Sequence, residues 1–287
     1  MNDIHWFPGH MAKARRLIEE KIKLIDIVIE IIDARIPYSS KNPMMDQLVH
    51  NKKKILVLSK VDLADVNKTK EWVQYYEKQG YQVIVSNLLS FKEFNKIVSE
   101  MKIELADKRE KDQKRGLKER PIRALVAGIP NVGKSTFINK MAKRNSTKTG
   151  DKAGVTKALQ WIKIANDFEL LDSPGILWPK LDDKQVALNL ALTGAIKDEI
   201  LPKEYLCFEA LKFLNIHYQK EFYQRYQLLE MTNNNESIVM TLEQIGRQRG
   251  CLIKGNEVDY DKVYDIILKE IKNNLIARMT FDYELPN

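Results

Sequence analysis

The first part of the chain alternates short apolar runs with longer stretches whose apolar residues recur at helical spacing. The runs are short, rich in β-branched residues and ended by polar loops, which predicts buried strands. They lie at 25–32, 55–58, 83–85, 122–127, 159–165 and 168–171, the last two joined by Asn166-Asp167 as in a hairpin. Helical spacing covers 11–24, 72–79 and 136–143. Strands that alternate with helices predict an α/β fold with a mostly parallel sheet.

The strand pattern ends after Pro179, and only helical spacing follows. We therefore expect two domains, 1–178 with the sheet and 179–287 built of helices. A linker at about 102–121 interrupts the first domain, because Lys, Arg, Glu and Asp dominate it. An arm that binds nucleic acid is the alternative for this linker, but its mixed charges favour a solvated helix end.

Residues 128–135 (GIPNVGKS) fit the pattern G-x-x-x-x-G-K-[ST], between a predicted strand and a predicted helix. That context indicates a P-loop, in which backbone amides and the helix N-terminus surround phosphates. Lys134 can reach the β- and γ-phosphates, and the Ser135 hydroxyl can coordinate Mg²⁺. The alternative is a glycine-rich turn without a ligand, which the correct flanks disfavour. The motif indicates a nucleoside triphosphate but does not say which base.

Residues 172–175 (DSPG) follow the strand at 168–171 and have the D-x-x-G arrangement. Asp172 would join the Mg²⁺ shell, and the Gly175 amide can approach the γ-phosphate closely. Thr156 lies in a loop between this motif and the P-loop, where it could close on Mg²⁺ as a switch. That signal is weak on its own, because any Thr in a loop would qualify.

The base is indicated by residues 58–62 (LSKVD), which resemble the [N/T]-K-x-D signature at the end of a strand. The Asp62 carboxylate can accept from guanine N1–H and its exocyclic amine, a donor pair that adenine lacks. The Lys60 stem can lie along the base plane. Residues 86–88, with Asn87 and Leu88, take the place of the S-A-K loop that packs on the base. A solvated strand end is the alternative for 59–60, and Asp62 argues against an ATPase.

The order of these motifs is permuted, because Asp62 and Asn87 precede Ser135, Thr156 and Asp172. A site assembled in space tolerates this, since each motif needs only its own strand end. The chain resembles the circularly permuted GTPases, and among them the ribosome biogenesis GTPase A group. The segments that carry the resemblance are 6–11 (WFPGHM), 33–37 (DARIP), 59–62, 128–135, 154–156 (GVT), 172–178, 194–197 (GAIK) and 249–251 (RGC).

The resemblance implies a P-loop GTPase fold, circularly permuted, with a mostly parallel sheet followed by an all-α C-terminal domain. It implies GTP hydrolysis at a late step of large (50S) ribosomal subunit assembly, with binding of ribosomal RNA. The expected nucleotide-binding residues are Ser59, Lys60, Val61, Asp62, Asn87, Leu88, Asn131, Val132, Gly133, Lys134, Ser135, Thr136 and Gly175. The chain departs from the family at Ser59, where Asn is usual, and at Leu88, where a small residue is expected.

Mg²⁺ and K⁺ are the expected cofactors. Ser135, Thr156 and Asp172 would hold Mg²⁺, with Asp172 acting through water. K⁺ would lie near Asn131, the P-loop position at which related GTPases use an Asn to hold a monovalent cation.

Lys134 and Thr156 are the expected catalytic residues, together with a group that positions water. Ras-type GTPases have a Gln just after D-x-x-G, but Ile176 stands there and cannot hydrogen-bond. His10 is the candidate, because Pro8 and Gly9 make a bend before it and a neutral imidazole suits the task near pH 7. The alternatives are that His10 caps the following helix or touches RNA.

Composition and charge limit the classes of protein and of partner that this chain can represent. The chain has 287 residues, of which 44% are hydrophobic, and this excludes a mostly disordered protein. Its net charge of +8 favours a polyanionic partner, although excess Lys could serve solubility alone. The sequence has two Cys and no apolar run of membrane length, so we expect a cytoplasmic protein with no membrane partner. We also expect a monomer. A GTPase switch in metabolism or signalling, without nucleic acid, is the alternative function.

Overall fold

A computed structural model describes residues 9–88, 91–145, 159–165, 167–175, 177, 183–196 and 200–286. One six-stranded sheet has the order β3-β2-β1-β4-β6-β5. Its strands are β1 (Ile27–Asp33), β2 (Lys53–Ser59), β3 (Gln82–Val85), β4 (Ile122–Ala127), β5 (Gln160–Ala165) and β6 (Phe168–Asp172). Only the β5–β6 pairing is antiparallel; the other four are parallel. The predicted α/β fold with a mostly parallel sheet is confirmed.

β1 lies at the centre of the sheet, and all seven of its residues are buried. Burial on both faces explains the continuous apolar runs. From β1 the chain builds outward through β2 to β3, then crosses back to place β4 on the other side of β1. The strand order therefore reverses between β1 and β4, and ligands of such sheets bind at this reversal, beside the carboxyl ends of the strands.

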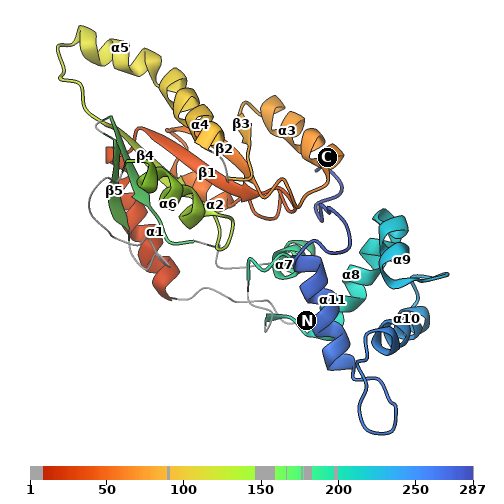
Figure 1. Cartoon of the computed structure of the whole chain (residues 1–287). Coiled ribbons are helices and arrows are strands. Elements are labelled where there is room, and N and C mark those ends of the chain that lie inside the picture. The colour runs from red at the N-terminus through yellow and green to blue at the C-terminus, as the bar shows by residue number, and fades with distance from the viewer. Residues whose placement is uncertain are drawn as a thin grey trace.

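Helices cover both faces of the sheet (Figure 1). They are α1 (Gly9–Lys21) with the short 3₁₀ helix η1 (Ile22–Leu24), α2 (Pro43–Leu48), α3 (Val66–Lys78), α4 (Phe91–Glu104), α5 (Ala106–Lys114) and α6 (Lys134–Asn145). The helix predicted from Trp72 begins earlier, because the Asp65 side chain accepts from the amides of Asn67 and Lys68 and caps it there. The charged linker contains α5, a helix of its own with no buried residue.

The C-terminal part is helical, as predicted, and lies beside the carboxyl-end side of the sheet (Figure 1). Its helices are α7 (Lys184–Leu192), α8 (Lys203–His217), α9 (Gln219–Tyr226), α10 (Asn235–Gln248) and α11 (Tyr260–Lys272). Apart from an isolated bridge between Leu252 and Val258, no strand pairing occurs in the described part of this region. We call residues 183–196 and 200–278 the helical region.

The sequence pattern did not predict that the chain returns to the sheet after α11. Residues 279–283 form a strap along the loops that follow β1 and β2, where Met279 N donates to Leu63 O and Phe281 N donates to Arg35 O. Trp72 Nε1 donates to Asp282 O at 2.8 Å, so the strap also contacts α3. The Asp282 carboxylate accepts from Ser39 Oγ at 2.6 Å and from Asn189 Nδ2 at 2.8 Å. Burial raises the pKa of Asp282 to about 6, although these hydrogen bonds act to lower it.

None of the helices in the described ranges is long and apolar enough to cross a membrane. Cys207 and Cys251 are both buried and free, as expected for ordinary thiols.

Candidate functional site

The loop between β4 and α6 has the backbone geometry that its glycines predict. Gly128 has a φ of +148°, and a Cβ on it would lie 2.4 Å from Ile31 O, so a larger residue would collide with β1. Gly133 has a φ of +106° and leads directly into α6, where Phe137 N donates to Gly133 O. Residues 128–135 therefore join the carboxyl end of β4 to a helix N-terminus, an arrangement suited to phosphate. We call them the phosphate loop.

Lys134 is buried within the phosphate loop. Its Nζ donates to Ile129 O at 2.6 Å, and its residue is 7% exposed. Desolvation lowers the pKa of Lys134 to about 8, opposed by the nearby Asp172 carboxylate. The ammonium thus lies inside the loop whose amides are expected to surround the phosphates.

The groups predicted to hold Mg²⁺ fall on neighbouring elements. Ser135 is half-buried in the first turn of α6, and Asp172 is buried at the end of β6, which pairs with β4 in register Val126↔Asp172. A hydroxyl and a carboxylate are hard oxygen donors that suit Mg²⁺, so the residues present fit this ion. Thr156, the third expected ligand, lies outside the described residues.

Gly175 of the D-x-x-G motif packs directly on the phosphate loop. A Cβ at Gly175 would lie 2.7 Å from Pro130 N, so only glycine fits the present approach. The preceding Ser173 Oγ donates to Val126 O at 2.6 Å and ties the motif to β4. The D-x-x-G motif therefore contacts the phosphate loop through Gly175.

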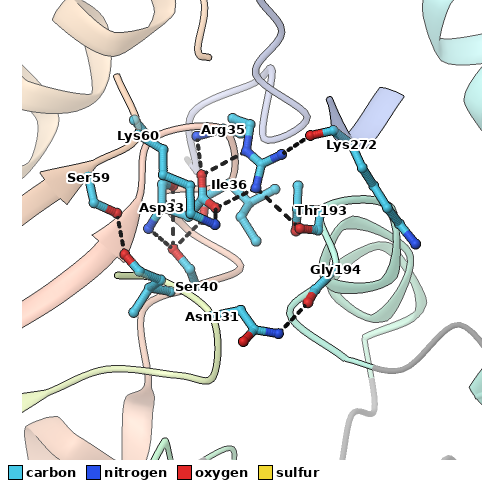
Figure 2. A network of polar contacts seen from close by, with 12 residues as sticks. Asp33, Arg35, Ile36, Ser40, Ser59, Lys60, Asn131, Thr193, Gly194 and Lys272 are labelled. Atoms are coloured by element: carbon cyan, nitrogen blue, oxygen red, sulfur yellow. Dashed lines mark hydrogen bonds and ion pairs between the residues drawn. The ribbon is translucent and has the colours of Figure 1, made fainter. Parts of the chain in front are cut away.

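The segment after β2 meets the phosphate loop from the other side. Ser59 Oγ lies 2.8 Å from Ile32 O and 2.7 Å from Val132 O, which links β2, β1 and the loop. Lys60 has a φ of 55°, and its Nζ donates to Asp33 Oδ2 at 2.8 Å (Figure 2). Asp62 is exposed and Val61 half-buried. We call residues 59–62 the base loop.

The segment after β3 also approaches the phosphate loop. Leu88 is buried with a φ of 58°, and its amide donates to Ser86 Oγ at 2.9 Å. Its Cδ1 lies 3.0 Å from the place that a Cβ on Gly133 would take. Asn87 is half-buried. The residues predicted to read the base and those predicted to hold phosphate thus converge at one edge of the sheet.

Sequence reasoning missed an ion-pair cluster at the end of β1. Asp33 is fully buried between the Arg35 guanidinium and the Lys60 ammonium, at 2.8 Å from each. Burial alone would raise the pKa of Asp33, but these two cations outweigh it and lower the pKa to about 2. The available signal was the D-A-R sequence directly after a buried strand, at the edge where the other motifs end.

Asn131, predicted to lie near K⁺, is exposed in the phosphate loop with a φ of 61°. Its Nδ2 donates to Gly194 O of the helical region at 2.8 Å. Thr136 is exposed in the first turn of α6.

The predicted catalytic groups other than Lys134 are not placed. Thr156 and Ile176 lie outside the described residues. His10 falls in the first turn of α1, but its side chain is likewise outside the described part.

Comparison with known proteins identifies the family. Residues 123–243 match the family model "50S ribosome-binding GTPase". The chain is 48% identical over 279 residues to ribosome biogenesis GTPase A of Bacillus cereus, covering 97% of this chain and 93% of that one. It is 50% identical over 280 residues to the protein of that name in Priestia megaterium, covering 97% and 96%. The crystal structure of GNP-bound YlqF from T. maritima matches with a TM-score of 0.65 and 26% identity, over 94% and 97% of the two chains. With relatives this similar over nearly its whole length, the chain belongs to the ribosome biogenesis GTPase A family.

Proposed function

We propose that this protein binds GTP where β1 and β4 diverge and hydrolyses it to GDP and phosphate during a late step of large ribosomal subunit assembly. The observation that carries the proposal is the contact of Ser59 Oγ with Val132 O at 2.7 Å. It brings the base loop against the phosphate loop, although 73 positions separate these two residues in the chain. The base and the triphosphate belong to one nucleotide, so the loops that bind them must lie next to each other.

The phosphates would bind to the backbone of residues 131–136 and to the Lys134 ammonium, which already lies inside the loop. Ser135, Asp172 and Thr156 would hold Mg²⁺, with Asp172 acting through water. The ion would neutralise charge on the β- and γ-oxygens when bound. Gly175 packs on Pro130, so a shift of the phosphate loop would move the D-x-x-G segment.

The base would be read by the exposed Asp62 carboxylate, which suits the donor pair of guanine. Lys60, Val61, Asn87 and Leu88 would pack around it. We also propose that K⁺ binds near Asn131 and that His10 positions the attacking water. These two roles rest on the sequence argument.

A ribosomal partner is supported by the family and by charge. The relatives carry ribosome biogenesis in their names, and the family model describes a 50S ribosome-binding GTPase. A net charge of +8 favours association with RNA. We propose residues 179–287 as the RNA-binding domain and the cytoplasm as the place of action. A GTPase switch without nucleic acid stays the alternative.

Cosedimentation separates these two functions. The protein is centrifuged with purified 50S subunits in GTP, GDP or a non-hydrolysable GTP analogue, and GTP turnover is measured with and without subunits. We expect nucleotide-dependent cosedimentation and faster turnover with subunits. GTP turnover that is unaffected by subunits, together with no cosedimentation in any nucleotide, would support the alternative.

A further inference from the structure

The Arg35 side chain connects the end of β1 to two helices of the helical region. Its Nη2 lies 2.8 Å from Asp33 Oδ2 and donates to Thr193 O at 3.2 Å, while Nη1 donates to Lys272 O at 3.5 Å (Figure 2). Nε completes the pair with Asp33 Oδ1 at 3.1 Å. Arg35 is 4% exposed, so these contacts are made out of water. One guanidinium thus contacts segments about 160 and 240 positions further along the chain.

Both backbone acceptors are helix C-termini. Thr193 is the C-cap residue of α7, and Lys272 is the last residue of α11. Carbonyls at such ends have no partner within the helix, and the helix dipole places partial negative charge there. A cation held between two such ends is favourable, and a planar guanidinium can donate in several directions at once.

The turn after α7 presents its carbonyls toward the nucleotide site. Gly194 has a φ of +74°, with Gly194 N bonded to Ala191 O and Ala195 N bonded to Leu190 O. These bonds occupy the amides of the turn and end the helix, so the carbonyls of Thr193 and Gly194 can accept from other residues. Two successive carbonyls, of Thr193 and Gly194, accept from residues of the nucleotide-binding part.

The two donors to this turn come from different sides of the site. Arg35 belongs to the cluster that also holds Lys60 of the base loop, through the shared Asp33 carboxylate. Asn131 belongs to the phosphate loop and donates to Gly194 O. Figure 2 shows both contacts meeting at the same turn. The turn therefore contacts both the base side and the phosphate side.

We propose that Asp33 and Arg35 are positioning residues for Lys60, and that this chain of contacts couples nucleotide binding to docking of the helical region. Nucleotide that fixes Lys60 would fix Asp33, then Arg35, and so the ends of α7 and α11. Coupling between two sites is reciprocal, so docking strengthens nucleotide binding by the same factor. The proposal rests on the role of Lys60 in base binding given above.

Amide hydrogen exchange of the full-length protein tests the coupling. Exchange of the Gly194, Ala195 and Asn273 amides is measured without nucleotide and with saturating GDP, in wild type and in Lys60→Met. Lys60 is half-buried, so this variant should fold. We expect GDP to slow these amides about tenfold in wild type, the size of one charge-assisted hydrogen bond, and less than twofold in Lys60→Met. Equal slowing in both proteins would overturn the coupling.

A double-mutant cycle tests whether Arg35 acts through Lys60. GDP affinity is measured for wild type, Arg35→Lys, Lys60→Met and the double variant, with Arg123→Lys as the matched control. Arg123 forms an ion pair of similar length with Glu169, at 2.9 Å, which is more exposed and lies at the other end of β4. We expect Arg35→Lys to weaken GDP binding about tenfold alone and less than twofold in the Lys60→Met background.

The failures can be told apart. Unchanged GDP affinity in Lys60→Met would overturn the base-reading role of Lys60, and with it the premise of the coupling. Weaker GDP binding in Lys60→Met with additive effects in the cycle would leave base reading intact and overturn the positioning role of Arg35. An effect of Arg123→Lys equal to that of Arg35→Lys would also overturn it, because both would then reflect general stability.

Discussion

The two sides of the nucleotide site are built in different ways. The phosphate side is one continuous loop, residues 128–135, whose backbone is expected to surround the phosphates. Its glycines are required where the backbone approaches a neighbour closely, as Gly128 approaches Ile31 O. The base side is assembled from side chains after β1, β2 and β3, and these are held by partners far away in the chain, as Lys60 is by Asp33. Backbone geometry tolerates few sequences, whereas side-chain networks can be rebuilt with different residues.

The largest expected effect is on the phosphate side. Lys134→Ala removes the buried ammonium that we propose contacts the β- and γ-phosphates, and we expect GTP affinity to fall about a hundredfold or more, measured by equilibrium binding. Lys118→Ala, an exposed lysine of the linker, is the control and should bind as wild type. Wild-type affinity in Lys134→Ala would contradict the assignment of the phosphate loop.

On the base side, Asp62→Asn should change selectivity more than affinity for phosphate. An amide cannot accept from both guanine donors, so we expect the preference for GTP over ATP to fall by roughly tenfold to a hundredfold. Competition binding with both nucleotides measures it, with Asp107→Asn on α5 as control. An unchanged preference would mean that guanine is read by other residues.

The pKa of Lys134 predicts a pH effect confined to the phosphate side. The pKa of Lys134 in the folded protein is about 8, below the ordinary 10.5, and the proposed phosphate contact requires the ammonium form. GTP affinity should therefore be constant below about pH 7 and fall up to tenfold per unit above pH 8. Without nucleotide the sign is reversed. The unfolded chain binds more protons between pH 8 and 10.5, so this lysine adds stability as pH rises.

A titration of GTP affinity from pH 6 to 9.5 checks the effect, with Lys134→Met as the reference variant. The steep loss above pH 8 should be absent from Lys134→Met, whose weaker binding should vary little. The same slope in both proteins would assign the titration to another group.

The smallest effect compares two buried serines. Ser59 Oγ links the base loop to Val132 O, and Ser173 Oγ links the D-x-x-G segment to Val126 O. Each change to Ala should cost about 1 kcal/mol of unfolding free energy. Only Ser59→Ala should weaken GDP binding more than pyrophosphate binding, because it loosens the base loop against the phosphate loop. Equal losses for both ligands would show that Ser59 acts on stability alone.

The same contrast explains what the sequence could predict. All six strands were found from apolar runs, and residues 128–135 were found from their spacing, because both depend on neighbours in sequence. The D-A-R sequence of residues 33–35 marked a place but not its partners, since Lys60, Thr193 and Lys272 are brought near by the fold. The return of 279–283 to the sheet was missed for the same reason: its bonds are to Leu63 O, Arg35 O and Ser39.

Ser59 stands where the family usually has Asn, and its side chain still contacts the phosphate loop. The Ser59 hydroxyl reaches Val132 O at 2.7 Å, so this shorter side chain links the base loop to the phosphate loop. Leu88, the other departure, fills the space beside Gly133.

The strap at 279–283 has a consequence for the order of events during translation. Trp72 and Ser39 both bond to Asp282, which lies 210 and 243 positions later in the chain and is therefore synthesised long after them. The sheet and its loops can therefore collapse on the nascent chain while the surface along α3 and the β1 loop is still uncovered. Only when residue 282 has left the exit tunnel can the indole N–H and the Ser39 hydroxyl exchange water for Asp282. Completion of this surface must therefore follow synthesis of residue 282, long after the strands of the sheet have been made.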